Sequence, residues 1–256
     1  MRFVQLICGV TLSLCSCLAL ADDGLNDLKR ALKQLQNNTV PIMAELSSSF
    51  TEQHDDEIKQ GAVSVLLNDN PSGFSLTYNS NYLEKMALEK QAKAQDENTL
   101  SPTLDAASKL KAIDLHRALA ASTDFLQFIA KGEYISEKLV KFNDQNIRLL
   151  SFELPMEAII SNKRTREYVD DFTANYQVWI DDAGIPLKSH LAFNGRGSAY
   201  LVLSVEAYGQ NTEFYQLINQ RLVIVNSESK HGSKSFFGDF ERYEKKVVNV
   251  IKQKSS

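Results

Sequence analysis

The spacing of apolar residues changes along the chain, and each change marks a new predicted element. In "GLNDLKRALKQLQNN" the leucines Leu25, Leu28, Leu32 and Leu35 recur every three or four residues, which predicts an amphipathic helix. Residues 40–53 then alternate between apolar and polar or small side chains, the pattern of a half-buried strand. "HDDE" and "DNPSG" supply turn residues, so the chain up to "GFSLTYN" predicts a meander of three antiparallel strands.

The middle of the chain has helical character. "NSNYLEKMALEKQAKAQDE" is rich in strong helix formers, and "NTLSP" interrupts it. In "AIDLHRALAASTDFLQFIAKG" the residues Leu115, Leu119, Leu126 and Ile129 fall on one stripe, and Gly132 ends the run. The pattern predicts a two-helix insert near residues 80–131, which either packs on a sheet or covers a pocket as a lid.

From Glu133 onward the strand pattern returns. "EYISEKLVKFNDQNIRLLSFELP" predicts a hairpin that turns at Asn143–Asp144, and a short charged segment leads to further strands. Two polar, glycine-containing stretches, "DDAG" at 181–184 and "NGRG" at 194–197, are interpreted as turns. The last predicted strand carries Lys245 and Lys246, charges that protect an exposed sheet edge.

About ten antiparallel strands in one sheet must curl, because each strand twists against its neighbour. The expected fold class is therefore α+β: a single curved antiparallel sheet, or half-barrel, with the amino-terminal helix and the two-helix insert on its concave side. Residues 22–256 are expected to form this one domain. A curled sheet with helices on its concave face encloses an apolar cavity unless side chains fill it.

The first 21 residues predict the compartment. Arg2 precedes an apolar run from Phe3 to Leu20, and Ala19-Leu20-Ala21 has the small residues that a signal peptidase reads. We expect a secretory signal peptide, residues 1–21, cleaved after Ala21, and a periplasmic protein with no transmembrane span once cleaved. Two alternatives stay open: an uncleaved membrane anchor, and a lipid anchor at Cys17, because "LCSC" loosely resembles a lipidation motif.

Cysteine usage and charge exclude several function classes. All three cysteines, Cys8, Cys15 and Cys17, lie in this leader, so the remaining chain predicts no thiol enzyme, zinc finger or redox protein. The chain has 32 acidic and 28 basic residues, and the leader removes one of the basic ones. A mildly acidic protein has no electrostatic case for binding nucleic acid or an anionic membrane.

Candidate chemistry is thin. The carboxylates of Asp181 and Asp182 are interpreted as turn residues, and "HDDE" at 54–57 lacks the spaced oxygens and glycine of a calcium loop. The four histidines are scattered, and there is no nucleophile elbow or phosphate-cradling glycine loop. Trp179 either lines a ligand groove or packs under the charged segment before it. The sequence predicts no catalytic residue, no cofactor and no metal.

The amino-terminal third resembles a known family. The order of "DLKRALKQL", a strand ending in "SSSFTEQ", and "QGAVSVLLNDNPSGFSLTY" is similar to the start of the periplasmic outer-membrane lipoprotein carriers, mainly over residues 25–78. Those proteins are antiparallel half-barrels, with helices on the inner face, that shield lipid chains. The family's basic residue near the turn between the second and third strands has no counterpart here, because "NDNPSG" holds none and no arginine occurs between Arg30 and Arg117.

Two hypotheses lead. The first is a non-catalytic, carrier- or chaperone-like protein that binds an apolar ligand, a lipid or acyl chain, alone or on a lipidated protein. The residues expected to line its cavity are Ile42, Leu46, Phe50, Phe125, Leu126, Ile129, Tyr176, Val178, Leu201 and Leu203. The second is an interaction or sensor module with a filled core and no ligand, which binds another envelope protein. An enzyme is not expected, and an unrecognised hydrolase is the remaining alternative.

Overall fold

The fold was obtained as a computed structural model that describes residues 23–36, 40–199, 203–236 and 238–251. The predicted signal peptide, its three cysteines and Leu201 lie outside these residues. In the part that is described, no helix is long and apolar enough to cross a bilayer.

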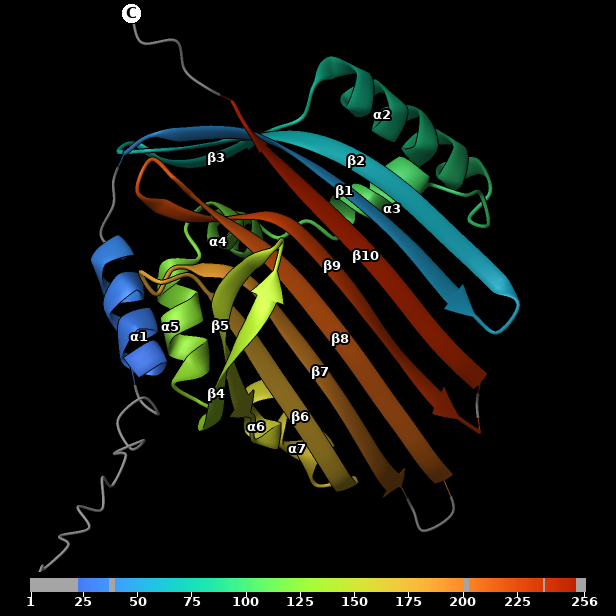
Figure 1. Cartoon of the computed structure of the whole chain (residues 1–256). Helices are drawn as coiled ribbons and strands as arrows, with labels where there is room; N and C mark the ends of the chain where they lie inside the picture. The colour runs from blue at the N-terminus through green and yellow to red at the C-terminus, as the bar shows by residue number, and fades with distance from the viewer. Residues whose placement is uncertain (1–22, 37–39, 200–202, 237, 252–256) are drawn as a thin grey trace, which may run out of the picture.

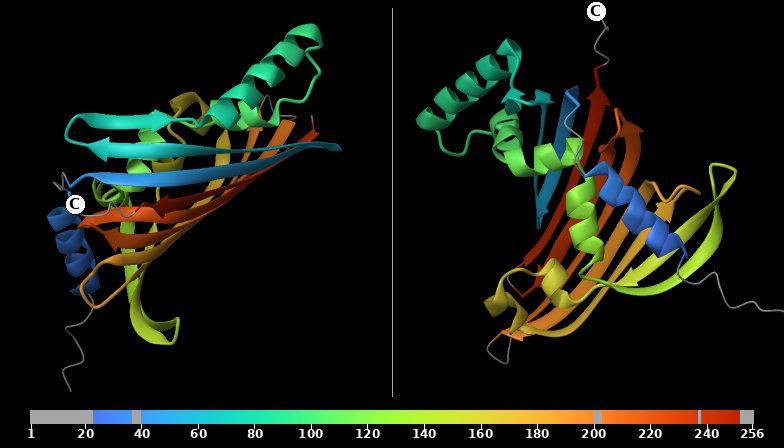
Figure 2. Two further views of the ribbon diagram at one scale, coloured as in Figure 1. Left: turned by 90° about the horizontal axis from the view of Figure 1, so that it is seen from above. Right: turned by 90° about the vertical axis from the view of Figure 1, so that its left-hand side faces the viewer.

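The described strands form one antiparallel sheet of ten, open at both edges, in the order β3-β2-β1-β10-β9-β8-β7-β6-β5-β4 (Figure 1). This confirms the predicted α+β fold with a single curved sheet, and Figure 2 shows the curvature. The strands are β1 (Ile42–His54), β2 (Glu57–Asn70), β3 (Gly73–Thr77), β4 (Glu133–Phe142), β5 (Gln145–Glu153), β6 (Val169–Ile180), β7 (Pro186–Ala199), β8 (Leu203–Ile218), β9 (Arg221–Ser235) and β10 (Gly238–Val250).

The last strand is not an edge, contrary to the prediction. β10 pairs with β9 on one side and with β1 on the other, so the last strand in sequence lies next to the first. Lys245 and Lys246 instead form ion pairs within the sheet, with Glu228 at 2.8 Å and Glu244 at 3.0 Å. Two lysines on a strand therefore do not identify an edge when acidic partners are available.

Seven helices accompany the described strands, and four of them form the insert that was predicted to hold two. The helices are α1 (Asp23–Leu35), α2 (Ser80–Gln95), α3 (Pro102–Ser108), α4 (Ala112–Leu119), α5 (Ser122–Ile129), α6 (Met156–Ile159) and α7 (Lys163–Arg166). The expected single helix over 112–131 breaks into α4 and α5. The backbone N–H of Ala121 donates to the carbonyl of Leu222 on β9 at 2.9 Å. This tertiary hydrogen bond takes the place of a hydrogen bond within the helix at the break.

The helices α1, α4 and α5 cover one end of the concave face (Figure 1). Their apolar stripes and the inward side chains of the sheet make one core, and α5 is tied to α1 by the Ser122 hydroxyl, which donates to the carbonyl of Leu35. Core residues from the helices are Leu25, Leu28, Leu32, Leu115, Leu119, Phe125 and Ile129; from the sheet, Ala44, Leu46, Leu67, Leu150, Val178, Ile180 and Leu222.

Two of the predicted turns are confirmed. Asn143 and Asp144 both have positive φ, at 48° and 64°, as a two-residue hairpin turn requires. In "DDAG", one carboxylate oxygen of Asp181 accepts hydrogen bonds from the backbone N–H groups of Ala183 and Ile185, and Gly184 has a φ of 84°. Asp181 therefore holds a loop, as its position between two strands predicts.

The predicted turn at "NGRG" is wrong, because these residues lie inside β7 and pair with residues 205–208 of β8. A Cβ on Gly197 would stand 1.9 Å from the carbonyl oxygen of Tyr168. The glycine is needed for this close approach of the chain and not for a reversal of direction.

Candidate functional site

Beyond α4 and α5 the strands β7 to β10 continue without a covering helix (Figure 1). Side chains on the concave floor are small here, with Ala207 and Gly209 on β8 and Ser227 and Ser229 on β9. The floor is therefore hollow where the helices end. We call the two adjoining hollows beside α4 and α5 the polar groove, and the hollow beside α6 and α7 the apolar cleft.

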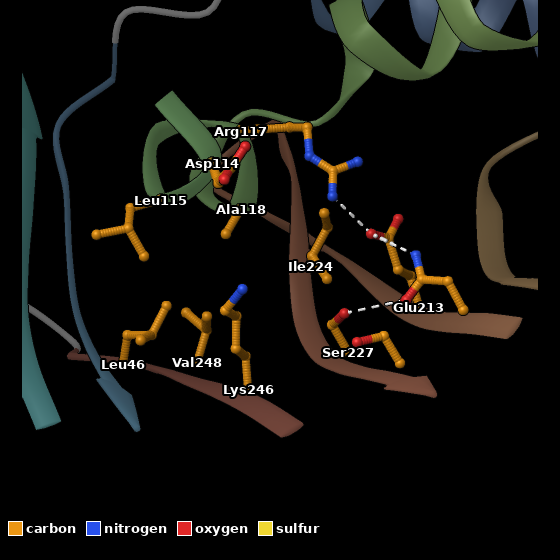
Figure 3. Close-up of a pocket in the computed structure, with 12 residues that line it drawn as sticks. Leu46, Asp114, Leu115, Arg117, Ala118, Glu213, Ile224, Ser227, Lys246 and Val248 are labelled. Carbon is orange, nitrogen blue, oxygen red and sulfur yellow. Dashed lines mark hydrogen bonds and ion pairs between the residues drawn. The ribbon is translucent and has the colours of Figure 1, made fainter. Parts of the chain in front are cut away.

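The polar groove consists of hollows of about 250 and 330 Å³ that share Arg117, Asn211 and Glu213. Figure 3 shows the first of them, with Asp114 and Arg117 descending from α4 and Lys246 rising from β10. The apolar part of its lining is formed by Leu46, Leu115, Ala118, Ile224 and Val248. The groove thus offers both donors and acceptors next to aliphatic surface.

Glu213 is the fixed centre of the groove. Its buried carboxylate accepts hydrogen bonds from Arg117 at 2.7 Å, from Asn211 at 3.2 Å and from the Tyr215 hydroxyl at 2.6 Å. The Tyr215 hydroxyl also lies 2.8 Å from the hydroxyl of Ser189. A buried carboxylate with this many donors has its hydrogen-bonding capacity met, so the Glu213 side chain is held in one position in the lining of the groove.

Burial sets the protonation of this network. Burial and the adjacent Glu213 raise the pKa of Tyr215 far above its ordinary value, so its hydroxyl keeps its proton and donates. Burial lowers the pKa of Arg117, but the charge and hydrogen bond of Glu213, together with Tyr215 and Asp114, raise it above its ordinary value. Within the groove the Arg117 guanidinium therefore stays charged, beside a Tyr215 hydroxyl that keeps its proton.

The apolar cleft has a volume of about 390 Å³ and lies between the strands β6–β8 and the segment that carries α6 and α7. The rings of Phe172 and Phe193 stack on its floor, with centroids 6.5 Å apart. Other apolar side chains in its lining are Ile160, Tyr168, Val169, Val205 and Ala207. Tyr168 and Val205 are 39% and 40% exposed, so apolar surface remains open to a ligand.

The residues that were expected to line a cavity lie mostly in the packed core. Ile42, Leu46, Phe50, Phe125, Ile129, Tyr176 and Val178 are each at most 5% exposed, and Leu126 is partly buried against the same core. Leu46, Phe125 and Tyr176 also line the polar groove. Leu203 is the first residue of β8, and Leu201 lies outside the described residues.

Sequence reasoning did not nominate the cleft residues. Phe172 and Phe193 lie in stretches whose alternation predicts apolar strand faces, and that alternation gives no sign that part of a face stays uncovered. The usable signal is the pair Gly195 and Gly197 in the middle of a strand. Glycine within a strand marks a place where another segment of the backbone approaches closely. Here the approaching chain is the α6–α7 segment that forms the outer wall of the cleft.

The remaining candidate residues have structural partners. The ammonium of Lys188 lies over the ring of Trp179, 4.5 Å from its centroid. The ring of His190 is 2.9 Å from the hydroxyl of Thr212. Within the described part of the chain, no group of three histidine, aspartate or glutamate side chains is placed to hold a metal ion.

No protein-family model, no curated protein and no solved structure matches this chain.

Proposed function

We propose that this chain is a non-catalytic periplasmic protein that binds an apolar chain, a lipid tail or an acyl group, in a carrier- or chaperone-like role. The observation that carries the proposal is the apolar cleft, which leaves aromatic and aliphatic surface uncovered beside the stacked rings of Phe172 and Phe193. The predicted signal peptide supports the periplasmic location. The resemblance of residues 25–78 to lipoprotein carriers supports the choice of ligand.

The cleft and not the core is proposed as the ligand site, for a physical reason. Phe125 and Val178 are 5% and 0% exposed, so a ligand would have to displace close-packed side chains to reach them. In the cleft, each methylene buried contributes about 0.8 kcal/mol before the cost of association. A chain of several methylenes therefore supplies enough driving force without any cofactor.

We expect Val205→Asp to weaken binding of a neutral apolar probe at least about tenfold, because a carboxylate in the cleft would have to lose its hydration when the probe enters. Val205 is 40% exposed, so the aspartate can stay hydrated in the free protein and the fold should survive. Fluorescence titration with N-phenyl-1-naphthylamine measures the affinity. The matched control is Ile135→Asp on β4, an apolar strand residue 54% exposed and away from the cleft. Equal affinity of wild type and Val205→Asp would refute the cleft as the site.

A second candidate function has one specific observation in its favour. The helix α2 buries none of its residues, and it packs on α3, which in turn packs on β2 (Figure 2). Its Leu83 and Leu88 are 52% and 60% exposed. Leucines exposed on a helix that buries none of its own residues suit docking to another envelope protein.

Native mass spectrometry of the protein, purified from its own envelope, separates the two candidates. A lipid near one per chain supports the apolar-ligand proposal. A stoichiometric protein partner without lipid supports the second candidate, and we then expect Leu88→Lys to release that partner while Leu139→Lys, at a 75% exposed position on β4, retains it.

A further inference from the structure

Charges of opposite sign face each other across the polar groove. Asp114 lies on α4 at one wall and Lys246 on β10 at the other (Figure 3). The Asp114 carboxylate forms no hydrogen bond or ion pair with any other described side chain, although its charge reaches Arg117. The Lys246 ammonium contacts Glu244 at 3.0 Å, which uses one of its three N–H donors.

The groove therefore contains an unused acceptor and unused donors at separate places. A purely anionic ligand would meet Asp114, and a purely cationic one would meet Lys246 and Arg117. A group with an ammonium at one end and an anion at the other satisfies both walls. The hydroxyls of Ser227 and Ser229 and the aliphatic lining of the groove leave room for the neutral part.

The concave face of β8 connects this groove to the apolar cleft. Asn211 lines the groove, Ala207 lines the cleft, and Gly209 stands between them. Four residues of strand span about 13 Å. The Phe193 ring packs over Gly209, where a Cβ would stand 2.4 Å from it, so an aromatic ring lies between the two sites.

We propose that the polar groove binds a zwitterionic head group with an ammonium and a phosphate, Asp114 receiving the ammonium and Lys246 with Arg117 receiving the phosphate. The inference rests on the proposed function, since the same molecule then places its apolar tail in the cleft. It names the ligand class as a zwitterionic amphiphile. A small free zwitterion presents the same charged groups as a lipid head group. The test therefore includes both kinds of ligand and distinguishes between them.

The test compares three short-chain lipids with the same dihexanoyl tails, by isothermal titration of the wild-type protein below their micelle concentrations. They are the phosphatidylethanolamine, the phosphatidylglycerol and the diacylglycerol. We expect the phosphatidylethanolamine to bind at least about tenfold more tightly than either of the others, the scale of one charge-assisted contact. Asp114→Asn should abolish its advantage over phosphatidylglycerol, and Lys246→Gln should weaken both phospholipids.

Two matched variants control for structure and net charge. Lys245→Gln changes the neighbouring lysine, which pairs with Glu228 instead of lining the groove, and should leave all three affinities unchanged. Asp105→Asn changes an acidic residue in the first turn of α3, as Asp114 is in the first turn of α4, but outside the groove, and should also have no effect. A loss in these controls equal to that in the groove variants would overturn the assignment.

The outcomes distinguish this inference from the proposed function. If the wild type binds all three lipids equally, the cleft holds apolar tails and the head-group assignment is wrong. If it binds none of them, the proposed function fails. Soluble phosphoethanolamine then decides the groove: binding that is lost in Asp114→Asn identifies a free zwitterion as its ligand, and no binding overturns the inference.

Discussion

Replacing Leu32 by alanine is expected to lower the free energy of unfolding by about 3 kcal/mol, within the range of roughly 2–5 kcal/mol for a fully buried leucine. Leu32 is 0% exposed and lies on the buried stripe of α1, which packs against α5 and β5. The truncation removes transfer free energy and leaves a cavity, whose collapse is limited by the packing of α1 against α5 and β5.

Urea unfolding followed by circular dichroism measures the change. The midpoint should fall while the slope stays the same, since the exposed area on unfolding is nearly unchanged. The control is Leu139→Ala, the same substitution at a residue 75% exposed on β4, with an expected change within about 0.5 kcal/mol. Equal midpoints for the two variants would show that α1 does not belong to the cooperative core.

The elements that sequence predicted well are those whose signal is local. Leu25, Leu28 and Leu32 repeat at helical spacing, and that spacing alone specifies which face of α1 is buried. Alternation along residues 42–50 likewise predicted β1 and its inward face. The turn at Asp181 needed only a carboxylate, a glycine and two flanking apolar runs.

Where prediction failed, a distant partner decided the structure. The break between α4 and α5 depends on a hydrogen bond from Ala121 to Leu222, a residue about a hundred positions later. The interior place of β10 depends on its pairing with β1, at the other end of the chain. Helix propensity and edge-protecting charges are weak preferences, and long-range pairing overrides both.

The candidate site was harder to predict than the fold. Apolar periodicity shows which face of a strand is apolar, but not which parts of that face another element covers. Val178 and Phe172 belong to the same face of β6. The first is covered by the core, whereas the second lies at the floor of the apolar cleft. Helices of the core cover Val178, whereas the segment with α6 and α7 leaves the cleft open above Phe172, and that segment has no clear apolar period in sequence.

One ion pair lies beyond the end of the pairing between β9 and β10. The β9–β10 ladder ends at the pair Asn226–Val247, so residues 221–225 of β9 diverge from β10. At this divergence Arg221 donates to the carboxylate of Asp69 on β2 and to the carbonyl of Val40. The Arg221 side chain is 5% exposed and that of Asp69 12%, so the two charges are desolvated together.

Replacing Arg221 by alanine is therefore expected to lower the free energy of unfolding by about 3–5 kcal/mol, because Asp69 would remain as a buried, uncompensated charge. His116, at 3.7 Å from Asp69 and 46% exposed in its side chain, offers only partial compensation. The control is Arg196→Ala, which breaks the exposed pair with Glu206 and should cost no more than about 1 kcal/mol in the same urea titration.

A double variant, Asp69→Asn with Arg221→Met, tests the cause. If the loss comes from an orphaned charge, removing both charges should recover a large part of the stability that Arg221→Ala loses. If the loss comes from the hydrogen bond between Arg221 and Val40, the double variant should be as unstable as the single one. A single-variant cost equal to that of Arg196→Ala would mean that the divergence of β9 from β10 is held by apolar packing, and that Asp69 finds enough water when its partner is removed.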